Sequence, residues 1–246
     1  QEGGLLSTLV QIAGRECYLF GENTAEAEIL LLQPLGEHEM QGIEREYQSI
    51  QAGTQKRFLL IAFWVGDWNR ELSPWRAPGV RQGEEFEGEG TETLRFLVEQ
   101  LIPEAIRTYG LREDVPVVLG GYSLAGLFAL WAAYQTDRFR AVAAVSPSVW
   151  FPGFLDYVLR EEIRAEAVYL SLGEKEERTR NRQMACVGEN IRQIGAMYEK
   201  SLAGENAKLE WNPGNHFQEP ERRTAKGFLW ALEREILLQF KKPVLR

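Results

Sequence analysis

Residues 115–131 read VPVVLGGYSLAGLFALW, and this stretch decides the fold. Its first part is short, apolar and rich in β-branched residues, which is typical of a buried strand. The part after Gly126 is rich in alanine and leucine and holds neither glycine nor proline, which predicts a helix packed against a sheet. Between the two, Ser123 lies in a glycine-rich turn. The stretch therefore predicts a strand, a sharp turn that carries a serine, and a helix.

The turn at Ser123 has the form of a nucleophile elbow. A serine in so sharp a turn needs small neighbours, because the incoming strand and the outgoing helix approach each other closely. Gly121 and Ala125 supply them, although the pattern departs from Gly-x-Ser-x-Gly in having alanine at the last position and glycine one residue later, at Gly126. The helix also directs backbone N–H groups and its positive dipole end at the place where an oxyanion forms. The alternative is an ordinary glycine-rich turn with a surface serine.

Length, charge and cysteine content limit the classes of protein to consider. A chain of 246 residues is predicted to form one domain over residues 1–246. Its formal net charge of −8 argues against a nucleic-acid partner, which needs a basic surface. Cys17 and Cys186 lack the spacing of metal ligands, so no metal site is predicted, and a single disulfide between them stays open. No apolar run approaches the ~20 residues that span a bilayer, and the start Gln-Glu-Gly-Gly lacks the form of a signal peptide, so we expect no membrane contact and a cytoplasmic location.

The segments before residue 91 predict a hairpin, a helix, a central strand and a long loop. Residues 16–20 and 27–32 are expected to form strands that pair antiparallel, and residues 42–50 a helix. The nearly continuous apolar run 57–64 predicts a central strand covered on both faces. We expect residues 65–90 to form an irregular loop, and a loop of that length in a compact domain is usually functional.

The rest of the chain alternates between strand and helix patterns. A helix is expected from an N-cap at Thr91 to Gly110, with Pro103 as a possible kink. Beyond the elbow helix we expect strands at 141–145, 165–172 and 207–211, and helices at 154–163, 184–201 and around 228–236. This alternation predicts an α/β fold, in which a mostly parallel sheet has helices on both faces and an antiparallel amino-terminal hairpin.

A nucleophilic serine needs a base that takes its proton and an acid that orients the base. The chain has two histidines. His38 lies in a polar Gly-Glu-His-Glu turn, where a solvated surface role is expected, whereas His216 follows the last predicted strand in a loop of Asn, Pro and Gly. The order serine, acid, histidine along the chain then requires a carboxylate soon after Leu172. Three candidates follow that residue: Glu174, Glu176 and Glu177.

These motifs resemble those of small serine esterases of the α/β-hydrolase superfamily, in the group that includes S-formylglutathione hydrolases and siderophore esterases. The resemblance spans roughly residues 16–240 and rests on Gly-Tyr-Ser-Leu-Ala-Gly, Leu-Gly-Glu-Lys-Glu and Gly-Asn-His. In relatives the acid stands three residues after the glycine that ends its strand, which maps onto Glu176. Aspartate is more frequent at that position. This departure leaves Glu177 as a rival acid and a Ser-His dyad without an essential acid as an alternative.

The remaining candidate site residues follow from the hypothesis that the protein is a serine hydrolase. The oxyanion hole is expected to use the backbone N–H of Leu124 and a second N–H from the loop after the strand at 58–64, at Trp64 or Val65. Trp68, Trp75 and Trp150 are candidates for an aromatic wall that binds substrate, although a buried tryptophan more often serves packing alone.

The predicted function is hydrolysis of a small-molecule carboxylic ester through an acyl-enzyme. Ser123 attacks, His216 transfers the proton and Glu176 orients His216. No metal or organic cofactor is implied, and the oligomeric state is open. Two alternatives remain: acyl transfer to an alcohol or sugar by the same residues, and a non-catalytic binding module on a hydrolase fold.

Overall fold

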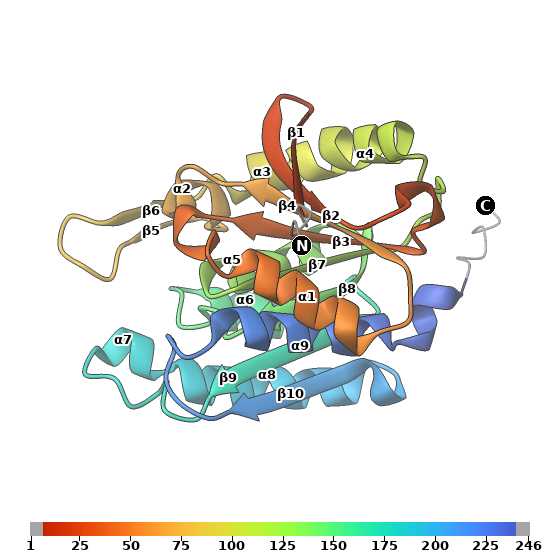
Figure 1. Cartoon of the computed structure of the whole chain (residues 1–246). Helices are drawn as coiled ribbons and strands as arrows, with labels where there is room; N and C mark the ends of the chain where they lie inside the picture. Colours follow the sequence, from red (N-terminus) through yellow and green to blue (C-terminus); the bar gives the residue numbers. More distant parts are fainter. Residues whose placement is uncertain (1–6, 240–246) are drawn as a thin grey trace.

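The computed structural model describes residues 7–239, and an eight-stranded sheet runs through the middle of this part of the chain (Figure 1). The first four residues, on which the expectation about a signal peptide depends, lie outside the described residues. The strands of the sheet follow the order β1-β2-β4-β3-β7-β8-β9-β10. Their bounds are β1 (Ser7–Ile12), β2 (Arg15–Phe20), β3 (Ile29–Leu35), β4 (Phe58–Trp64), β7 (Val117–Tyr122), β8 (Phe139–Val145), β9 (Ala167–Gly173) and β10 (Ala207–Asn212).

Six of the eight strands are parallel. β1 pairs antiparallel with β2, and β2 pairs antiparallel with β4, whereas all other neighbours in the sheet are parallel. β3, β7 and β9 are buried along their whole length, because helices cover the parallel part of the sheet on both faces. This arrangement confirms the predicted fold class, with its mostly parallel sheet and antiparallel amino-terminal hairpin.

The composition of that hairpin was predicted wrongly. Residues 27–32 do not pair with residues 16–20; they belong to β3, which lies between β4 and β7 in the middle of the sheet. The hairpin partner of β2 is β1, joined to it through Ala13 and Gly14 with φ of 50° and 82°. The continuous apolar run of β3 needs cover on both faces, which a central parallel strand receives and a hairpin strand at the edge does not.

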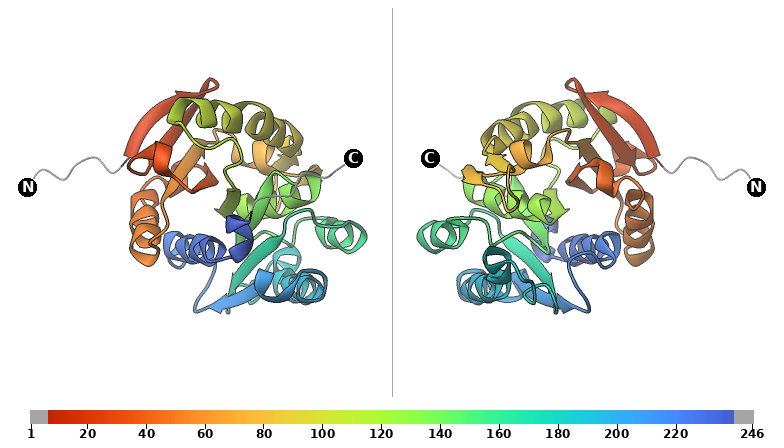
Figure 2. Two further views of the ribbon diagram at one scale, coloured as in Figure 1. Left: turned by 90° about the vertical axis from the view of Figure 1, so that its right-hand side faces the viewer. Right: turned by 90° about the vertical axis from the view of Figure 1, so that its left-hand side faces the viewer.

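Helices cover the two faces of the sheet unequally (Figure 2). On one face α1 (Ile43–Gly53) and α9 (Pro220–Leu232) lie side by side. Apolar residues of α3, α4, α5, α6 and α8 join the core on the other face. Their bounds are α3 (Gly90–Phe96), α4 (Ile102–Tyr109), α5 (Leu124–Gln135), α6 (Phe154–Arg160) and α8 (Val187–Ser201). The pleat of β3 divides its side chains between the two layers, with Leu30 and Leu32 in one core cluster and Ile29 and Leu31 in the other.

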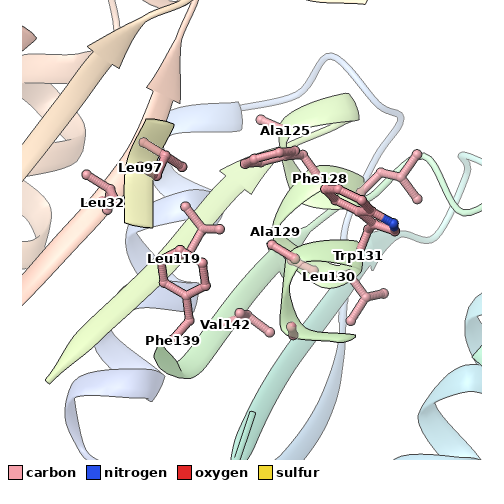
Figure 3. Packing of buried hydrophobic residues seen from close by; sticks show 14 of the residues in the cluster. Leu32, Leu97, Leu119, Ala125, Phe128, Ala129, Leu130, Trp131, Phe139 and Val142 are labelled. Atoms are coloured by element: carbon pink, nitrogen blue, oxygen red, sulfur yellow. The ribbon is translucent and has the colours of Figure 1, made fainter. Parts of the chain in front are cut away.

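The elbow strand and its helix lie in the hydrophobic core, where their buried side chains pack against each other (Figure 3). Phe128 and Ala129 of α5 and Leu119 of β7 have no exposed surface. A Cβ atom added to Gly126 would lie 3.0 Å from the carbonyl oxygens of both Gly121 and Val145. The helix can therefore approach the strand ends only because this position has no side chain, which fixes where α5 begins.

Several predicted boundaries differ from the structure. Residues 65–90 include a short helix, α2 (Trp68–Leu72), and a small antiparallel hairpin of β5 (Arg76–Pro78) and β6 (Glu85–Glu87), so they are not irregular throughout. The helix expected from Thr91 begins at Gly90 and contains a π-helical segment, Leu97–Leu101, directly before α4. Gly110 ends α4 with φ of 68°, which confirms its predicted place. The helix expected at 184–201 is divided into α7 (Arg182–Ala185) and α8.

Two further expectations concern cysteines and membranes. The thiols of Cys17, which is buried, and Cys186, which is exposed, are both free, so no disulfide joins them. Within residues 7–239, no helix has the length and apolar character that crossing a membrane requires.

Candidate active site

Three loops at one edge of the sheet bring Ser123, Glu176 and His216 together. They follow β7, β9 and β10, and the carboxyl ends of parallel strands lie at the same edge of a sheet. The Nε2 atom of His216 lies 2.9 Å from the Oγ atom of Ser123, and its Nδ1 atom lies 2.5 Å from Oε1 of Glu176. A continuous chain of hydrogen bonds therefore connects a hydroxyl, an imidazole and a carboxylate, although the residues are up to 93 positions apart.

Ser123 occupies a strained position between β7 and α5. Its backbone has φ of 64° and ψ of −121°, a conformation that a residue with a side chain rarely adopts. Its N–H donates to the Val145 carbonyl at 3.0 Å, which holds the turn against β8. A Cβ atom added to Gly121 would lie 2.6 Å from the Cβ atom of Ala125. The small residues around the serine are thus a steric requirement of the turn.

Glu176 is the acidic residue that the fold places beside His216. Its side chain is only 5% exposed, and its Oε2 atom accepts hydrogen bonds from the Gly173 N–H at 2.6 Å and the Ser146 hydroxyl at 2.8 Å. Burial raises the pKa of Glu176, but the hydrogen bond from His216, the charge interaction with it and the bonds from Gly173 and Ser146 outweigh burial and hold the pKa below its ordinary value. The carboxyl is therefore ionised at neutral pH.

The two rival acids lie elsewhere. The Glu177 carboxylate pairs with Arg192 of α8 at 2.9 Å, and that hydrogen bond lowers its pKa. Glu174 is exposed to solvent. Of the three carboxylates after β9, Glu176 is thus the one that the turn directs into the site.

The ring of His216 is held in one orientation. Because ionised Glu176 only accepts hydrogen bonds, Nδ1 carries the proton and Nε2 is free to accept one from Ser123. The Tyr122 ring packs against the imidazole with a centroid distance of 5.1 Å, and its hydroxyl donates to the His216 carbonyl. Phe217 follows with 83% of its surface exposed, at the edge of the site.

A cavity of about 910 Å³ opens beside Ser123 and His216. Trp68 and Trp150 line it, as the sequence suggested for an aromatic wall, and so do Leu124 and Phe217. Trp75 is not among the residues that line this cavity. Its indole N–H donates to the Pro152 carbonyl at 2.9 Å, and its ring packs against Phe151 and Phe154.

His38, expected to be a solvated surface residue, also lines the cavity. Its side chain is 61% exposed and meets the Trp68 ring edge-on at 4.7 Å. Partial burial of the ring lowers its pKa, which favours the uncharged imidazole beside that tryptophan.

Backbone N–H groups near the cavity lie at the start of α5 and in the loop after β3. Leu124 begins α5 and lines the cavity, and the first N–H groups of a helix have no acceptor within the helix. The Val65 N–H donates to the Leu35 carbonyl at 3.0 Å, and neither Trp64 nor Val65 lines the cavity. β3, and not β4, is the neighbour of β7, so the loop that faces the elbow is the one that begins at Gly36. The sequence-based expectation of a donor at Trp64 or Val65 remains a prediction, and the strand order adds the loop at Gly36 as a candidate.

That loop contains a buried carboxyl group. The Gly36 N–H donates to Oε1 of Glu39 in a weak bond of 3.4 Å. Burial raises the pKa of Glu39 to about 8, although the Gly36 hydrogen bond opposes the increase. Glu46 of α1 lines the same cavity, and burial followed by the Glu39 charge raises its pKa well above the ordinary value. Burial therefore favours the protonated form of both carboxyl groups.

Sequence reasoning missed four residues around the site: Ser146, Ser148, Tyr122 and Arg223. The Ser148 hydroxyl lies 3.5 Å from that of Ser123. Arg223 is 3% exposed and contacts the loop of His216. Apart from the place of Tyr122 directly before the serine, no sequence pattern marks them, because their partners are distant along the chain. In the part of the chain that the structure describes, no group of three or more His, Cys, Asp or Glu side chains is arranged to hold a metal ion.

The fold is that of an α/β-hydrolase, and solved structures share it. The siderophore hydrolase EstA of Aspergillus nidulans is similar with a TM-score of 0.68 and 18% identity, covering 95% of this chain and 97% of that one. The IroE-like serine hydrolase of Shewanella oneidensis has a TM-score of 0.69 and 16% identity, covering 92% and 79%. The enterobactin esterase FES of Shigella flexneri has a TM-score of 0.65 and 15% identity, covering 94% and 61%.

The sequence itself carries the family relationship. Residues 28–222 match the profile of the family described as "Putative esterase", which covers more than half of the chain. The chain belongs to this family, and this membership supports an ester hydrolase. No curated protein sequence matches it.

Proposed function

We propose that the protein hydrolyses a small-molecule carboxylic ester through a covalent acyl-enzyme. The observation that carries this proposal is the hydrogen-bonded series of Ser123, His216 and Glu176, with 2.9 Å between hydroxyl and imidazole and 2.5 Å between imidazole and carboxylate. A serine hydroxyl becomes a useful nucleophile when a base accepts its proton and a fixed acid stabilises the resulting imidazolium. The strained backbone at Ser123 and the adjacent cavity support the same role.

The reaction proceeds in two acyl transfers. Oγ of Ser123 bonds to the ester carbonyl carbon while its proton passes to Nε2 of His216. The tetrahedral intermediate collapses, the C–O bond to the alcohol breaks, and His216 donates the proton to the leaving oxygen. Water then attacks the acyl-enzyme, gives its proton to His216, and the carboxylic acid departs as the proton returns to Ser123.

Glu176 acts through charge and orientation, and backbone N–H groups act on the oxyanion. The Glu176 carboxylate stays ionised and stabilises the imidazolium that forms in each transfer. The Leu124 N–H, at the first turn of α5, is placed to donate to the oxyanion. We assign the second donor to the loop that starts at Gly36, since the Val65 N–H is already bonded to Leu35.

The substrate class follows from the cavity. Its volume of about 910 Å³ accommodates a molecule of the size of a drug or a small natural product, and Trp68, Trp150 and Phe217 provide an aromatic lining. The similar structures include two proteins described as siderophore hydrolase and enterobactin esterase, so siderophore esters belong in the first panel of substrates.

The proposal is tested with a fluorophosphonate probe and intact-mass analysis. Wild-type protein should gain one adduct, while Ser123→Ala should gain none and His216→Ala should react at least 100-fold more slowly. Glu177→Gln is the matched control and should label like the wild type, because its carboxylate pairs with Arg192. A folded wild-type protein that gains no adduct would leave a binding module as the better account.

A further inference from the structure

The loop that carries His216 connects β10 to α9 and contains Asn, Pro and Gly residues that favour no regular structure. Its Gly214 has φ of 94°, a conformation that favours glycine. A base that must lie 2.9 Å from its serine needs more than such a segment to keep it in place. The groups that hold this loop in place therefore determine the distance between His216 and Ser123.

One buried cation contacts the loop at several points. The Nη2 atom of Arg223 donates to the Pro213 carbonyl at 2.7 Å, and Nη1 donates to the Asn215 carbonyl at 2.9 Å. Nη1 also donates to the hydroxyl of Tyr122 at 3.2 Å, and that hydroxyl in turn donates to the carbonyl of His216. Arg223 thus reaches the backbone carbonyls of Pro213 and Asn215 directly and that of His216 through one hydroxyl.

The same guanidinium lies beside the acid. Its Nη1 atom is 3.7 Å from Oε2 of Glu176, and the side chains of the two residues are 4% and 5% exposed. Opposite charges at this distance in a buried site favour the ionised carboxylate. The titratable and charged groups around Glu176 are His216 from the loop, Arg223 from α9 and Tyr122 from β7.

The space around this contact is filled. A Cβ atom added to Gly173, at the end of β9, would lie 2.5 Å from the Gly214 carbonyl and 3.2 Å from Nη1 of Arg223. Backbone bonds also connect the turn of the acid to the loop of the base, from the Glu174 N–H to the Asn212 carbonyl at 2.8 Å and from the Lys175 N–H to the Gly214 carbonyl at 3.0 Å. The guanidinium therefore lies where the loops that carry Ser123, Glu176 and His216 come together.

We propose that Arg223 is the positioning residue of the site, which fixes the His216 loop against the elbow strand and balances the charge of Glu176. This proposal rests on the proposed function, because it assigns Arg223 an effect through His216 and Glu176 rather than a contact with substrate. The guanidinium spreads its five N–H donors over three nitrogens in one plane, and two of these nitrogens reach the two carbonyls and the hydroxyl; lysine has three N–H donors on a single nitrogen and does not reproduce this geometry.

The experiment compares Arg223→Gln, Arg223→Lys and Tyr122→Phe with Arg222→Gln as matched control. Arg222 precedes Arg223 on the same helix turn, but its side chain is 70% exposed and pairs with Glu219. For each protein, circular dichroism and thermal unfolding report folding, and ester hydrolysis over a range of pH gives kcat and KM.

We expect Arg223→Gln to lower kcat about 100-fold with little change in KM, since a base displaced by about 1 Å costs this much. On acidification, its kcat should begin to decline at a higher pH than that of the wild type, because loss of a buried cation 3.7 Å from the Glu176 carboxylate favours protonation of the site. Arg223→Lys should keep the wild-type pH dependence and recover part of kcat. Tyr122→Phe, which removes one hydroxyl and leaves the core intact, should lower kcat about fivefold. Arg222→Gln should leave both parameters unchanged.

Folded Arg223→Gln with kcat within twofold of the wild type and the same pH dependence would overturn the proposal. If Arg223→Gln does not fold, an unchanged kcat in folded Tyr122→Phe and Arg223→Lys would overturn it as well. Failure of the proposed function has a different signature, since wild-type protein would then neither label with fluorophosphonate nor hydrolyse any ester.

Discussion

Replacing Glu39 by glutamine should stabilise the protein, and more so as the pH rises. Glu39 lies in the loop after β3, where burial raises its pKa to about 8 against an ordinary value near 4.3. A carboxyl group whose pKa is raised by folding ionises in the unfolded chain first. Stability is therefore lost as the pH rises from about 4.3 to about 8, and no further loss occurs above that window. Glutamine has no ionisable group and keeps an oxygen to accept the Gly36 hydrogen bond.

The size of the effect follows from the shift. A pH of 7 lies about 2.7 units above the pKa of the carboxyl in the unfolded chain, whereas in the folded protein the carboxyl is still mostly protonated. This difference corresponds to at most about 3.7 kcal/mol of folding free energy. The Glu39 side chain is 17% exposed, and solvent reduces the effect, so we expect about 1–3 kcal/mol. For a chain of this length, that corresponds to an increase in Tm of roughly 2–10 °C.

Thermal and urea unfolding at pH 4, 5, 6, 7 and 8 measures the difference between variant and wild type. Glu46, whose pKa is also raised, is present in both proteins, so most of its contribution cancels in the difference. Glu37→Gln is the control, because Glu37 lies in the same turn and is exposed to solvent. A stability difference for Glu39→Gln that stays constant from pH 4 to pH 8 would refute the reasoning about its burial.

Three further predictions concern the site. Glu176→Gln should lower kcat about 10²- to 10⁴-fold with little effect on KM, because the variant no longer stabilises the imidazolium. Steady-state kinetics checks this with Glu177→Gln as the control, and equal losses in both variants would contradict the assignment of Glu176. Gly173→Ala should destabilise the fold by about 1–3 kcal/mol and lower kcat, since its Cβ would lie 2.5 Å from the Gly214 carbonyl, and urea unfolding together with kcat tests both effects. Phe217→Ala should raise KM about 3- to 30-fold for esters with a large apolar group and leave kcat for small acetates unchanged, because a ring that is 83% exposed at the edge of the cavity can only gain burial from the substrate. If the variant and the wild type have the same KM for the large apolar esters, this expectation is wrong.

The local parts of the candidate site were accessible from the sequence. The strand, turn and helix around Ser123 follow from a short apolar run, small residues and an alanine-rich segment, all within 17 positions of the chain. The glutamates after β9 and the histidine after β10 could be located because parallel strands direct their carboxyl ends to the same edge. The choice of Glu176 among three neighbouring carboxylates came from the resemblance to known esterases, and the structure places that carboxylate 2.5 Å from the imidazole.

The arrangement of the strands was not accessible in the same way. The order of β3 and β4 in the sheet depends on which buried faces fit together across the whole molecule, and both strands are apolar enough for a central place. That order decides which loop faces the elbow, so the sequence, which predicted the second oxyanion donor at Trp64 or Val65, did not identify the loop beginning at Gly36 as a neighbour of the serine. The same limit explains the hairpin, where β1, with its mixture of polar and apolar residues, showed no clear strand pattern.

The sequence by itself determined the class of fold, the serine in its strained turn and the positions along the chain at which a base and an acid can follow. Those features depend on local conformation and on periodic burial, which a stretch of ten to twenty residues specifies. Tertiary structure alone decided which loop borders the cavity and that Arg223 lies buried beside the base and the acid. These contacts join residues between 8 and 101 positions apart, and their geometry exists only after the sheet has brought its strand ends together.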